Sequence, residues 1–273
     1  MMQGRTVIFT DLDGTLLDPV TYSCMRALPA LELLRQKRIP VVFCSAKTRA
    51  EQEAYQTRLH IFDPFIVENG GAIFIPQGYF PFPLERAKVV DRYSVIELGM
   101  AYADIRAILE RIRSEMRIEF RGFGDMSPEE VAMGTGLDRE SAWQAKQREY
   151  DETVKLKGNP EEIERVLGAI AEAGLHYAQG GKYYDIMGPN DKGRAVTILI
   201  NLFRQKLGLL KTVGIGDSLN DLSMLSVVNV PILVQKGSGE WESMDLPRLR
   251  KVQGIGPEGW VRAVENLLQL SQL

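Results

Sequence analysis

The chain has 273 residues, of which 45% are hydrophobic and 25% are charged, a composition that fits a folded globular protein and excludes a disordered or fibrous one. Its 33 Lys and Arg against 36 Asp and Glu give a net charge of -3, so it lacks the positive field with which nucleic-acid-binding proteins attract phosphates. The length excludes one small module and indicates two domains, or one large domain with an insertion.

The cysteines and the first residues of the chain indicate in which cellular compartment the protein works. Cys24 and Cys44 are too few for a disulfide scaffold and lack the spacing of a zinc site, so we expect two buried thiols in a reducing environment. The apolar run in RTVIFT meets acidic residues too soon for a signal peptide or a membrane span. We therefore expect a cytoplasmic protein without membrane or nucleic-acid partners, and the sequence leaves a homodimer open.

The first part of the chain alternates between buried strands and helices. Short apolar runs bounded by turn residues predict strands, and leucines at helical spacing predict helices. In chain order these are a strand at 5–10, a helix at 25–37, a strand at 40–45, a helix at 49–59 and a strand at 64–68. Parallel strands joined by right-handed helical crossovers predict an α/β fold, a Rossmann-like doubly wound parallel sheet.

This alternation stops near Phe82 and resumes near Asp191. The segment between them shows a helix at about 101–116, the strand-like RIEFRGF, a capping box at Ser127, the strand-like ETVKLKG and YYDIM, and a helix that begins at Asn159. This mixture predicts an inserted α+β domain over residues 83–187, while residues 1–82 and 188–273 form the α/β domain. The latter part should contain a helix at 192–207, a strand at 212–217, a helix from 219, the strand NVPILV and a helix at 257–270.

The strongest motif is Asp11-Leu12-Asp13-Gly14-Thr15, directly after the first strand. Residues i and i+2 of an extended chain point to the same side, so the carboxylates of Asp11 and Asp13 can face one site at the carboxyl end of the sheet. A D-x-D-G-T pattern arises by chance on the order of once per 10⁵ positions. The structural alternative is an acidic turn in which Gly14 supplies positive φ.

A second acidic cluster, Gly216-Asp217-Ser218-Leu219-Asn220-Asp221, also follows a strand. Alone it is equally typical of a plain turn with Asp217 or Ser218 as helix cap. Together with the first motif it offers hard oxygen ligands at the ends of neighbouring strands, which suits Mg²⁺. We expect Asp217 to be a direct ligand and Asp221 to bind through water or to orient Lys192.

Ser45 and Lys192 complete a phosphate-binding pattern. Ser45 follows a strand and can offer its hydroxyl and nearby backbone N–H groups at a helix N-terminus. Lys192 begins a helix, where the helix dipole disfavours a cation, so a bound phosphate would explain it. The alternative for Lys192 is a solvated surface lysine.

These motifs resemble, in their order along the chain, the four motifs of the haloacid dehalogenase-like phosphohydrolases. The insertion between the second and third motifs resembles the mobile cap of the Cof-type branch. REYDE at 148–152, GGKYYDIMG at 180–188 and ENGG at 68–71 are similar to segments of the mannosyl-3-phosphoglycerate phosphatase family. Ser45 stands where many superfamily members have Thr, a change that keeps the hydroxyl.

The resemblance implies a phosphatase that works through an aspartyl-phosphate. Asp11 would be the nucleophile, Asp13 the general acid and base, and Lys192 and Ser45 would hold the phosphoryl oxygens. Mg²⁺ would be the cofactor, with the main-chain carbonyl of Asp13 among its ligands. The expected metal site consists of Asp11, Asp13, Asp217 and Asp221.

The substrate implied is a phosphorylated glycosyl-glycerate, whose carboxylate requires a cation outside the phosphate site. Arg148 and Lys182 are the candidates, with a solvated or ion-paired surface charge as the alternative for each. The expected substrate contacts are Ser45, Asn69, Gly70, Arg148, Lys182, Lys192 and Asn220. Mannose versus glucose stays open, as do a broad sugar-phosphate phosphatase, a phosphomannomutase-like phosphotransferase and a non-catalytic sensor of a phosphorylated ligand.

Overall fold

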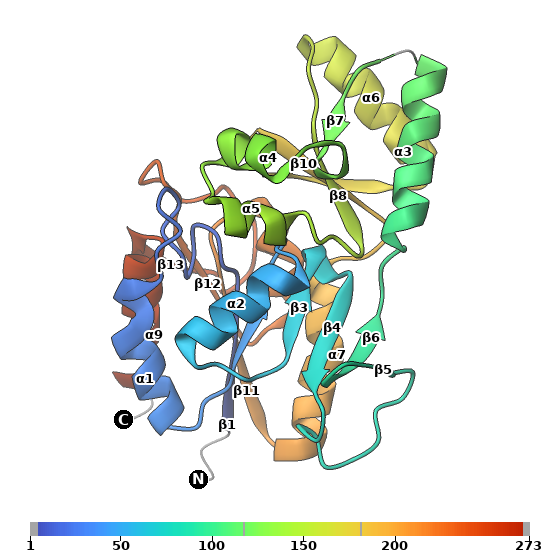
Figure 1. Cartoon of the computed structure of the whole chain (residues 1–273). Coiled ribbons are helices and arrows are strands. Elements are labelled where there is room, and N and C mark those ends of the chain that lie inside the picture. Colours follow the sequence, from blue (N-terminus) through green and yellow to red (C-terminus); the bar gives the residue numbers. More distant parts are fainter. Residues whose placement is uncertain (1–4, 117, 181, 270–273) are drawn as a thin grey trace.

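The computed structural model describes residues 5–116, 118–180 and 182–269. It contains a nine-stranded sheet and a separate four-stranded sheet, and Figure 1 shows the smaller sheet with its helices above one end of the larger one. The carboxyl end of the first strand points toward this upper part. The sheet edge that the sequence marks as functional therefore lies at the junction of the two parts.

The nine-stranded sheet is mostly parallel, as expected. Its six strands on one side run parallel, and three antiparallel strands extend the other side. In spatial order they are β13 (Arg250–Ile255), β12 (Val230–Gln235), β11 (Leu210–Gly216), β1 (Arg5–Thr10), β2 (Val41–Cys44), β3 (Phe65–Val67), β4 (Ala72–Pro76), β6 (Tyr93–Glu97) and β5 (Lys88–Val90).

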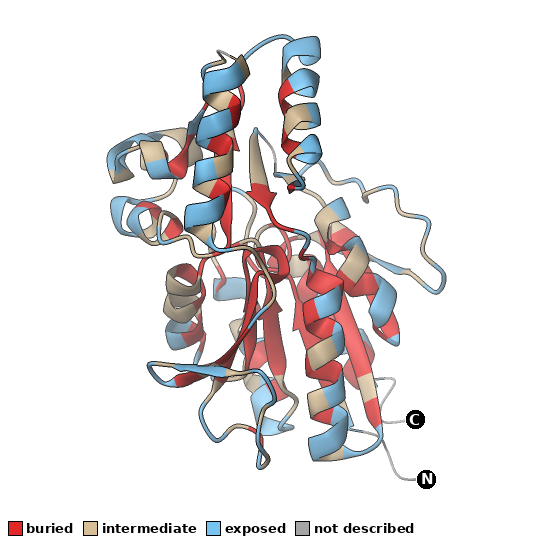
Figure 2. Ribbon diagram, turned by 90° about the vertical axis from the view of Figure 1, so that its right-hand side faces the viewer, coloured by how far each residue is buried: buried red, intermediate tan, exposed pale blue. Residues whose placement is uncertain are grey.

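Helices cover both faces of this sheet because its central strands are apolar on both sides. Ile8 of β1 faces one core cluster, whereas Val7 and Phe9 face the other. One face carries α1 (Leu28–Gln36), α2 (Arg49–Leu59) and α9 (Pro257–Gln269), and the other carries α7 (Lys192–Leu207) and α8 (Leu222–Val227). Figure 2 shows the buried residues along these strands and on the inward sides of the helices. The doubly wound fold is confirmed, and Cys24 and Cys44 are free, buried thiols.

The segment after Phe82 differs from its expected place. The sequence assigns residues 83–97 to the insertion, but β5 and β6 join the nine-stranded sheet, with β6 antiparallel to β4. Tyr93 and Val95 of β6 belong to the same core cluster as the central strands. The alternation of buried and exposed side chains in β6 is typical of an antiparallel strand with one buried face. A strand of this kind does not continue the βαβ pattern, so the sequence pattern did not assign it to the main sheet.

The smaller sheet is antiparallel, in the order β7 (Arg121–Gly122), β8 (Asp151–Lys155), β10 (Tyr183–Met187) and β9 (His176–Gly180). Two amphipathic helices, α3 (Tyr102–Met116) and α6 (Pro160–Glu172), pack on it through one apolar cluster. Two shorter helices, α4 (Pro128–Thr135) and α5 (Arg139–Ala145), form a second cluster nearer the large sheet (Figure 1). The capping box at Ser127 and the helix start at Asn159 are confirmed, and Asn159 also forms a capping box.

Short and exposed elements are where the predicted boundaries differ. In RIEFRGF only Arg121 and Gly122 form a strand, and residue 117 lies outside the described residues. The expected helix from Leu219 begins with a single 3-10 turn, Leu219–Asp221, before α8. Further 3-10 turns are Met25–Ala27, Glu68–Gly70 and Phe123–Asp125. The edge strands β9 and β13 were not expected, because they are largely exposed and lack an apolar pattern.

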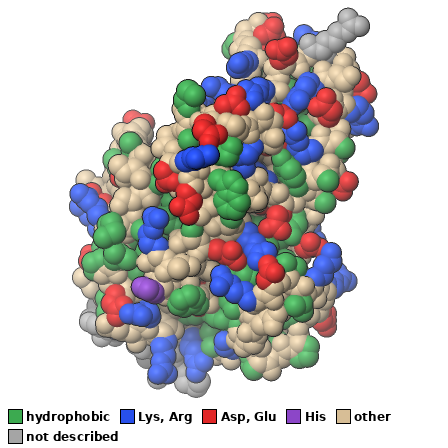
Figure 3. Space-filling model, in the orientation of Figure 1, with side chains coloured by type: hydrophobic (Ala, Val, Ile, Leu, Met, Phe, Trp, Pro, Cys, Tyr) green, Lys and Arg blue, Asp and Glu red, His purple; other side chains and the backbone are tan. Residues whose placement is uncertain are grey.

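The surface charges and the helices agree with the near-neutral net charge and the mixed composition of the sequence. On the face drawn in Figure 3, Lys and Arg side chains are interspersed with Asp and Glu rather than gathered by sign. Within the described part of the chain, none of the helices has the length and apolar character that crossing a membrane requires.

Candidate active site

Three neighbouring strands of the large sheet bring the sequence motifs to one edge. β1 lies between β2 and β11, and the backbone N–H of Asp11 donates to the carbonyl of Ile215 at 2.9 Å. Because all three strands are parallel, Asp11, Ser45 and Asp217 emerge at the same end. This end faces the smaller sheet and its helices in Figure 1.

Asp11, Asp217 and Asp221 form an acidic cluster. Each offers a carboxylate oxygen, and these oxygens all lie within 4.8 Å of one another. Asp221 also accepts the backbone N–H of Asp217 at 3.0 Å, which fixes the loop that carries both. Gly14 is required beside them, since its φ is +75° and a Cβ there would lie 2.7 Å from Asp217 Oδ2.

Lys192, the first residue of α7, inserts between two of these acids. Its Nζ lies 2.7 Å from Asp11 Oδ1 and 2.8 Å from Asp221 Oδ1, and its side chain is 1% exposed. The reading of Lys192 as a solvated surface lysine is therefore wrong. Two carboxylates of the chain itself explain a cation where the helix dipole disfavours one. Of the two roles expected for Asp221, this contact matches the orientation of Lys192.

The electrostatics of the cluster favour a further cation. Burial raises the pKa of Asp11 to about 7, with Asp221 and Asp13 adding to the rise and Lys192 opposing it. Burial, Asp221 and Asp11 hold the pKa of Asp217 well above its ordinary range. One lysine thus compensates three carboxylates, and closely spaced carboxylate oxygens suit a hard divalent ion such as Mg²⁺. The residues present fit the expected kind of cofactor.

Asp13 and Ser45 lie beside this cluster and share a neighbour that the sequence analysis did not identify. Lys47 Nζ lies 3.0 Å from Asp13 Oδ2, and the backbone N–H of Lys47 donates to the Ser45 hydroxyl at 3.3 Å. Asp13 Oδ1 is buried without a hydrogen-bond partner among the described residues. The sequence feature that could have identified Lys47 as a site residue is its position two residues after Ser45. The main-chain carbonyl of Asp13 as a metal ligand stays a prediction.

Thr15 is a second residue without an expected role, although it belongs to the first motif. Its hydroxyl donates to Asp217 Oδ1 at 3.1 Å, across two segments that are distant in the sequence. Thr15 is fully buried. It therefore orients one of the acids of the cluster.

Asn69, Gly70 and Asn220 follow β3 and β11 and make different contacts. Asn69 follows β3, where its side-chain amide donates to Asp185 Oδ2 at 3.3 Å. Gly70 has a φ of +93°, and a Cβ there would lie 2.2 Å from the main-chain oxygen of Asp191, so close packing already requires glycine. Asn220 accepts a hydrogen bond from the Ser218 hydroxyl at 2.7 Å. Their contacts to substrate stay predictions.

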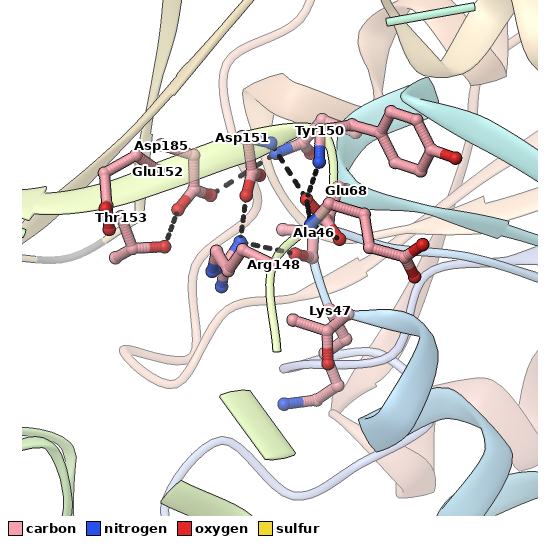
Figure 4. Close-up of polar contacts among 12 residues, drawn as sticks. Ala46, Lys47, Glu68, Arg148, Tyr150, Asp151, Glu152, Thr153 and Asp185 are labelled. Atoms are coloured by element: carbon pink, nitrogen blue, oxygen red, sulfur yellow. Dashed lines mark hydrogen bonds and ion pairs between the residues drawn. The ribbon is translucent and has the colours of Figure 1, made fainter. Parts of the chain in front are cut away.

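Arg148 and Lys182, the expected carboxylate-binding cations, lie in contrasting places. Arg148 is buried, and its guanidinium pairs with Asp151 and donates to the carbonyl of Ala46 at 3.3 Å (Figure 4). Arg148 is therefore not solvated: of its alternative role as a solvated or ion-paired surface charge, the ion pair is confirmed, but the pair is buried. Lys182 is exposed, and its Nζ lies 5.8 Å from the ring centroid of Tyr183.

Glu68 connects the Arg148 segment to the large sheet. Its carboxylate accepts the backbone N–H groups of Glu149, Tyr150 and Asp151, at 2.6 to 3.1 Å (Figure 4). Burial raises the pKa of Glu68 to about 7, although Arg148 and these hydrogen bonds oppose the rise. This acid was part of the ENGG segment, yet its role as an acceptor depends on a chain segment about eighty residues away.

Known proteins with similar sequences define the class. The chain belongs to the haloacid dehalogenase-like hydrolase family, which it matches over residues 8–244. It is 48% identical over 265 residues to a glucosyl-3-phosphoglycerate/mannosyl-3-phosphoglycerate phosphatase of Methanococcoides burtonii, covering 97% of each chain. It is 38% identical to a mannosyl-3-phosphoglycerate phosphatase of Pyrococcus horikoshii, covering 84% of this chain and 90% of that protein.

Solved structures agree on the fold. A protein of Thermoplasma acidophilum has a TM-score of 0.68 at 16% identity, with 99% of each chain covered. The sucrose-phosphatase of Synechocystis has a TM-score of 0.61 at 17% identity, with 97% of this chain and 98% of that one covered. These structures support the fold, whereas the family model and the similar sequences confirm the resemblance to haloacid dehalogenase-like phosphohydrolases.

Proposed function

We propose that this chain is a Mg²⁺-dependent phosphatase that hydrolyses mannosyl-3-phosphoglycerate or glucosyl-3-phosphoglycerate to the glycosylglycerate and inorganic phosphate, a step in the synthesis of a charged compatible solute. The observation that carries the proposal is the buried cluster of Asp11, Asp217 and Asp221 with Lys192 at the carboxyl ends of β1 and β11. The relatives that match nearly the whole chain support the substrate class.

Asp11 is the proposed nucleophile. One of its oxygens attacks phosphorus, the ester bond to the substrate oxygen breaks, and an aspartyl-phosphate forms. Lys192 contacts Asp11 Oδ1, which supports a role in orienting the carboxylate and in compensating phosphoryl charge. When bound, Mg²⁺ supplies charge neutralisation that lets a carboxylate approach a phosphate dianion, and Asp11, Asp217 and Asp221 would hold it, with Asp13 contributing its carbonyl.

Asp13 is the proposed general acid and base. It donates a proton to the departing alkoxide, then takes a proton from the water that attacks phosphorus and frees Asp11. The unpartnered Oδ1 of Asp13 supports this role, because a buried carboxylate oxygen normally has a hydrogen-bond donor. Ser45 is proposed to hold a phosphoryl oxygen through its hydroxyl.

The domain division belongs to the same proposal. We place the phosphatase core at about residues 1–98 and 188–273, because β5 and β6 belong to the large sheet, and the substrate-selecting cap between them. A cytoplasmic location, the absence of nucleic-acid and membrane partners and a homodimer remain expectations from the sequence.

The test is phosphate release from purified protein with Mg²⁺. Mannosyl- and glucosyl-3-phosphoglycerate should be hydrolysed without any added acceptor, at a kcat/KM well above that for simple sugar phosphates. Equal rates across the sugar phosphates would indicate a broad phosphatase. A requirement for an acceptor sugar would indicate a phosphotransferase, and ligand-dependent thermal stabilisation without turnover would indicate a sensor.

A further inference from the structure

A buried lysine beside Asp13 has no role in the chemistry described so far. Lys47 follows β2, and its side chain is 6% exposed. Its Nζ lies 3.0 Å from Asp13 Oδ2 and 3.1 Å from Glu51 Oε1. Glu51 holds the ammonium group of Lys47 in place, because Glu51 is itself fixed in the first turn of α2 by a capping box with Thr48.

Two aromatic rings surround the same ammonium group. Lys47 Nζ lies 5.3 Å from the ring centroid of Tyr22 and 5.9 Å from that of Tyr55. The negative faces of such rings stabilise a cation, so they help to maintain the charge of the largely buried Lys47 side chain. The ammonium is thus held at the active-site edge by one acid of α2 and two rings, independently of Asp13.

We propose that Lys47 binds the carboxylate of the glycerate part of the substrate, an inference that rests on the proposed function. In a 3-phosphoglycerate the carboxyl carbon and the carbon that bears the phosphate ester are joined through a single carbon. Asp13 must reach the ester oxygen to protonate it, and Lys47 touches Asp13. The carboxylate therefore falls beside Lys47 when the ester oxygen lies beside Asp13.

The alternative cation, Arg148, is already committed within the protein. Its guanidinium pairs with Asp151 and with a main-chain carbonyl, and Figure 4 shows it among acids, with Lys47 separate from that group. Breaking a buried pair leaves an uncompensated charge, so Arg148 is poorly suited to exchange partners. Lys47 differs from Arg148 because one of its two acidic partners, Asp13, must contact the ester oxygen of the substrate in the proposed reaction. Lys47 can then exchange that partner for a substrate carboxylate.

A consequence for catalysis follows from the shared contact. An ammonium has three N–H donors, and Asp13 and Glu51 engage two of them. The third donor can bind a substrate carboxylate, whose negative charge then repels Asp13 Oδ2 on the same ammonium and favours the turn of that side chain to the ester oxygen. Substrates without the carboxylate leave Asp13 on Lys47, so the carboxylate should raise kcat as well as lower KM.

The test compares two substrates that differ only in the carboxylate. One is glucosyl-3-phosphoglycerate, and the other is the matching phosphate ester of glucosylglycerol, in which a hydroxymethyl group replaces the carboxylate. For the wild type we expect a preference for the carboxylate substrate of about 10- to 100-fold in kcat/KM, the value of a charge-assisted hydrogen bond. In Lys47→Met this preference should fall to about onefold, with the loss confined mainly to the carboxylate substrate.

Controls separate this result from structural damage. Lys206→Met removes another lysine that lies on aromatic rings, Tyr79 and Phe80, and should keep the preference. Lys47→Arg keeps a cation and should retain part of it. If Lys47→Met does not melt cooperatively, Lys47→Gln takes its place with the same expectation.

The outcomes distinguish the inference from the proposed function. An equal loss on both substrates in Lys47→Met would mean that the residue only positions Asp13, and would overturn the inference. A wild type that hydrolyses both substrates equally well would overturn it too, while leaving phosphatase activity intact. No phosphate release from either substrate by the wild type would instead contradict the proposed function.

Discussion

Lys192 Nζ lies 2.7 Å from Asp11 Oδ1, although the two residues are 181 positions apart in the sequence. The contact joins the start of α7, after the insertion, to the end of β1, at the beginning of the chain. It depends on the return of the chain to the large sheet, and it places a buried lysine of the acidic cluster next to the proposed nucleophile. Several expectations depend on it.

Lys192→Met should destabilise the metal-free protein by about 3 to 5 kcal/mol, because it leaves Asp11 and Asp221 as uncompensated buried acids. Urea unfolding at neutral pH in the presence of a chelator measures this loss. Mg²⁺ should restore part of the stability, since it compensates the same oxygens. A loss below about 1 kcal/mol, similar to that of the surface control Lys206→Met, would contradict the charge balance described above.

The metal-free protein should lose stability as pH rises from about 4 to 7. The pKa of Asp11 is raised from 3.8 to about 7 in the folded state, so the folded protein binds more protons than the unfolded chain over this interval. Stability therefore falls with increasing pH. Thermal melts with a chelator at several pH values measure the trend, which should weaken in Asp11→Asn and with saturating Mg²⁺. A stability that rises over this range in both proteins would contradict the raised pKa.

Asp13→Asn and Asp217→Asn should separate catalysis from metal binding. Asp13→Asn should lower kcat by about 10²- to 10⁴-fold, the usual contribution of a general acid and base, while Mg²⁺ affinity changes little. Asp217→Asn should lose most of the Mg²⁺ affinity, because it removes one of the three clustered acids. Titration calorimetry with Mg²⁺ gives both affinities. Loss of metal binding in Asp13→Asn would contradict its assignment as acid and base.

Arg148→Met should destabilise the protein by about 3 to 5 kcal/mol, since it leaves Asp151 buried without its partner. The double variant Arg148→Met/Asp151→Asn should recover most of this stability, because the two residues interact directly. Denaturant unfolding of the four proteins completes the cycle. If the double variant is as unstable as Arg148→Met, the ion pair with Asp151 is not the main contribution of Arg148 to stability.

The sequence predicted the elements with strong apolar periodicity and the core of the site. Strands β1, β2 and β11 follow from short buried runs, and Asp11 and Asp217 follow from their position directly after such runs. The convergence of these acids needs only parallel strands and a common sheet edge. This is why local pattern was sufficient for them.

The remaining features depend on contacts that no local pattern encodes. β6 has the alternation of any half-buried strand, so only its pairing with β4 assigns it to the large sheet. Lys47 is unremarkable in sequence, and its contact with Asp13 joins two segments that are distant along the chain. Arg148 was expected to bind substrate, but its pairing with the neighbouring Asp151 and its proximity to Glu68 became apparent only in the folded chain. Burial of a charge is a tertiary property, and its partners become apparent only in the folded chain.

The central claim is that Asp11 accepts the phosphoryl group of a glycosyl-3-phosphoglycerate. Acid quenching during turnover with Mg²⁺, reduction of the trapped acyl phosphate with borohydride and peptide mass spectrometry test it directly. The account predicts conversion of Asp11 to homoserine that depends on the presence of substrate. Full turnover with an unmodified Asp11, or with the modification on another carboxylate, would contradict it.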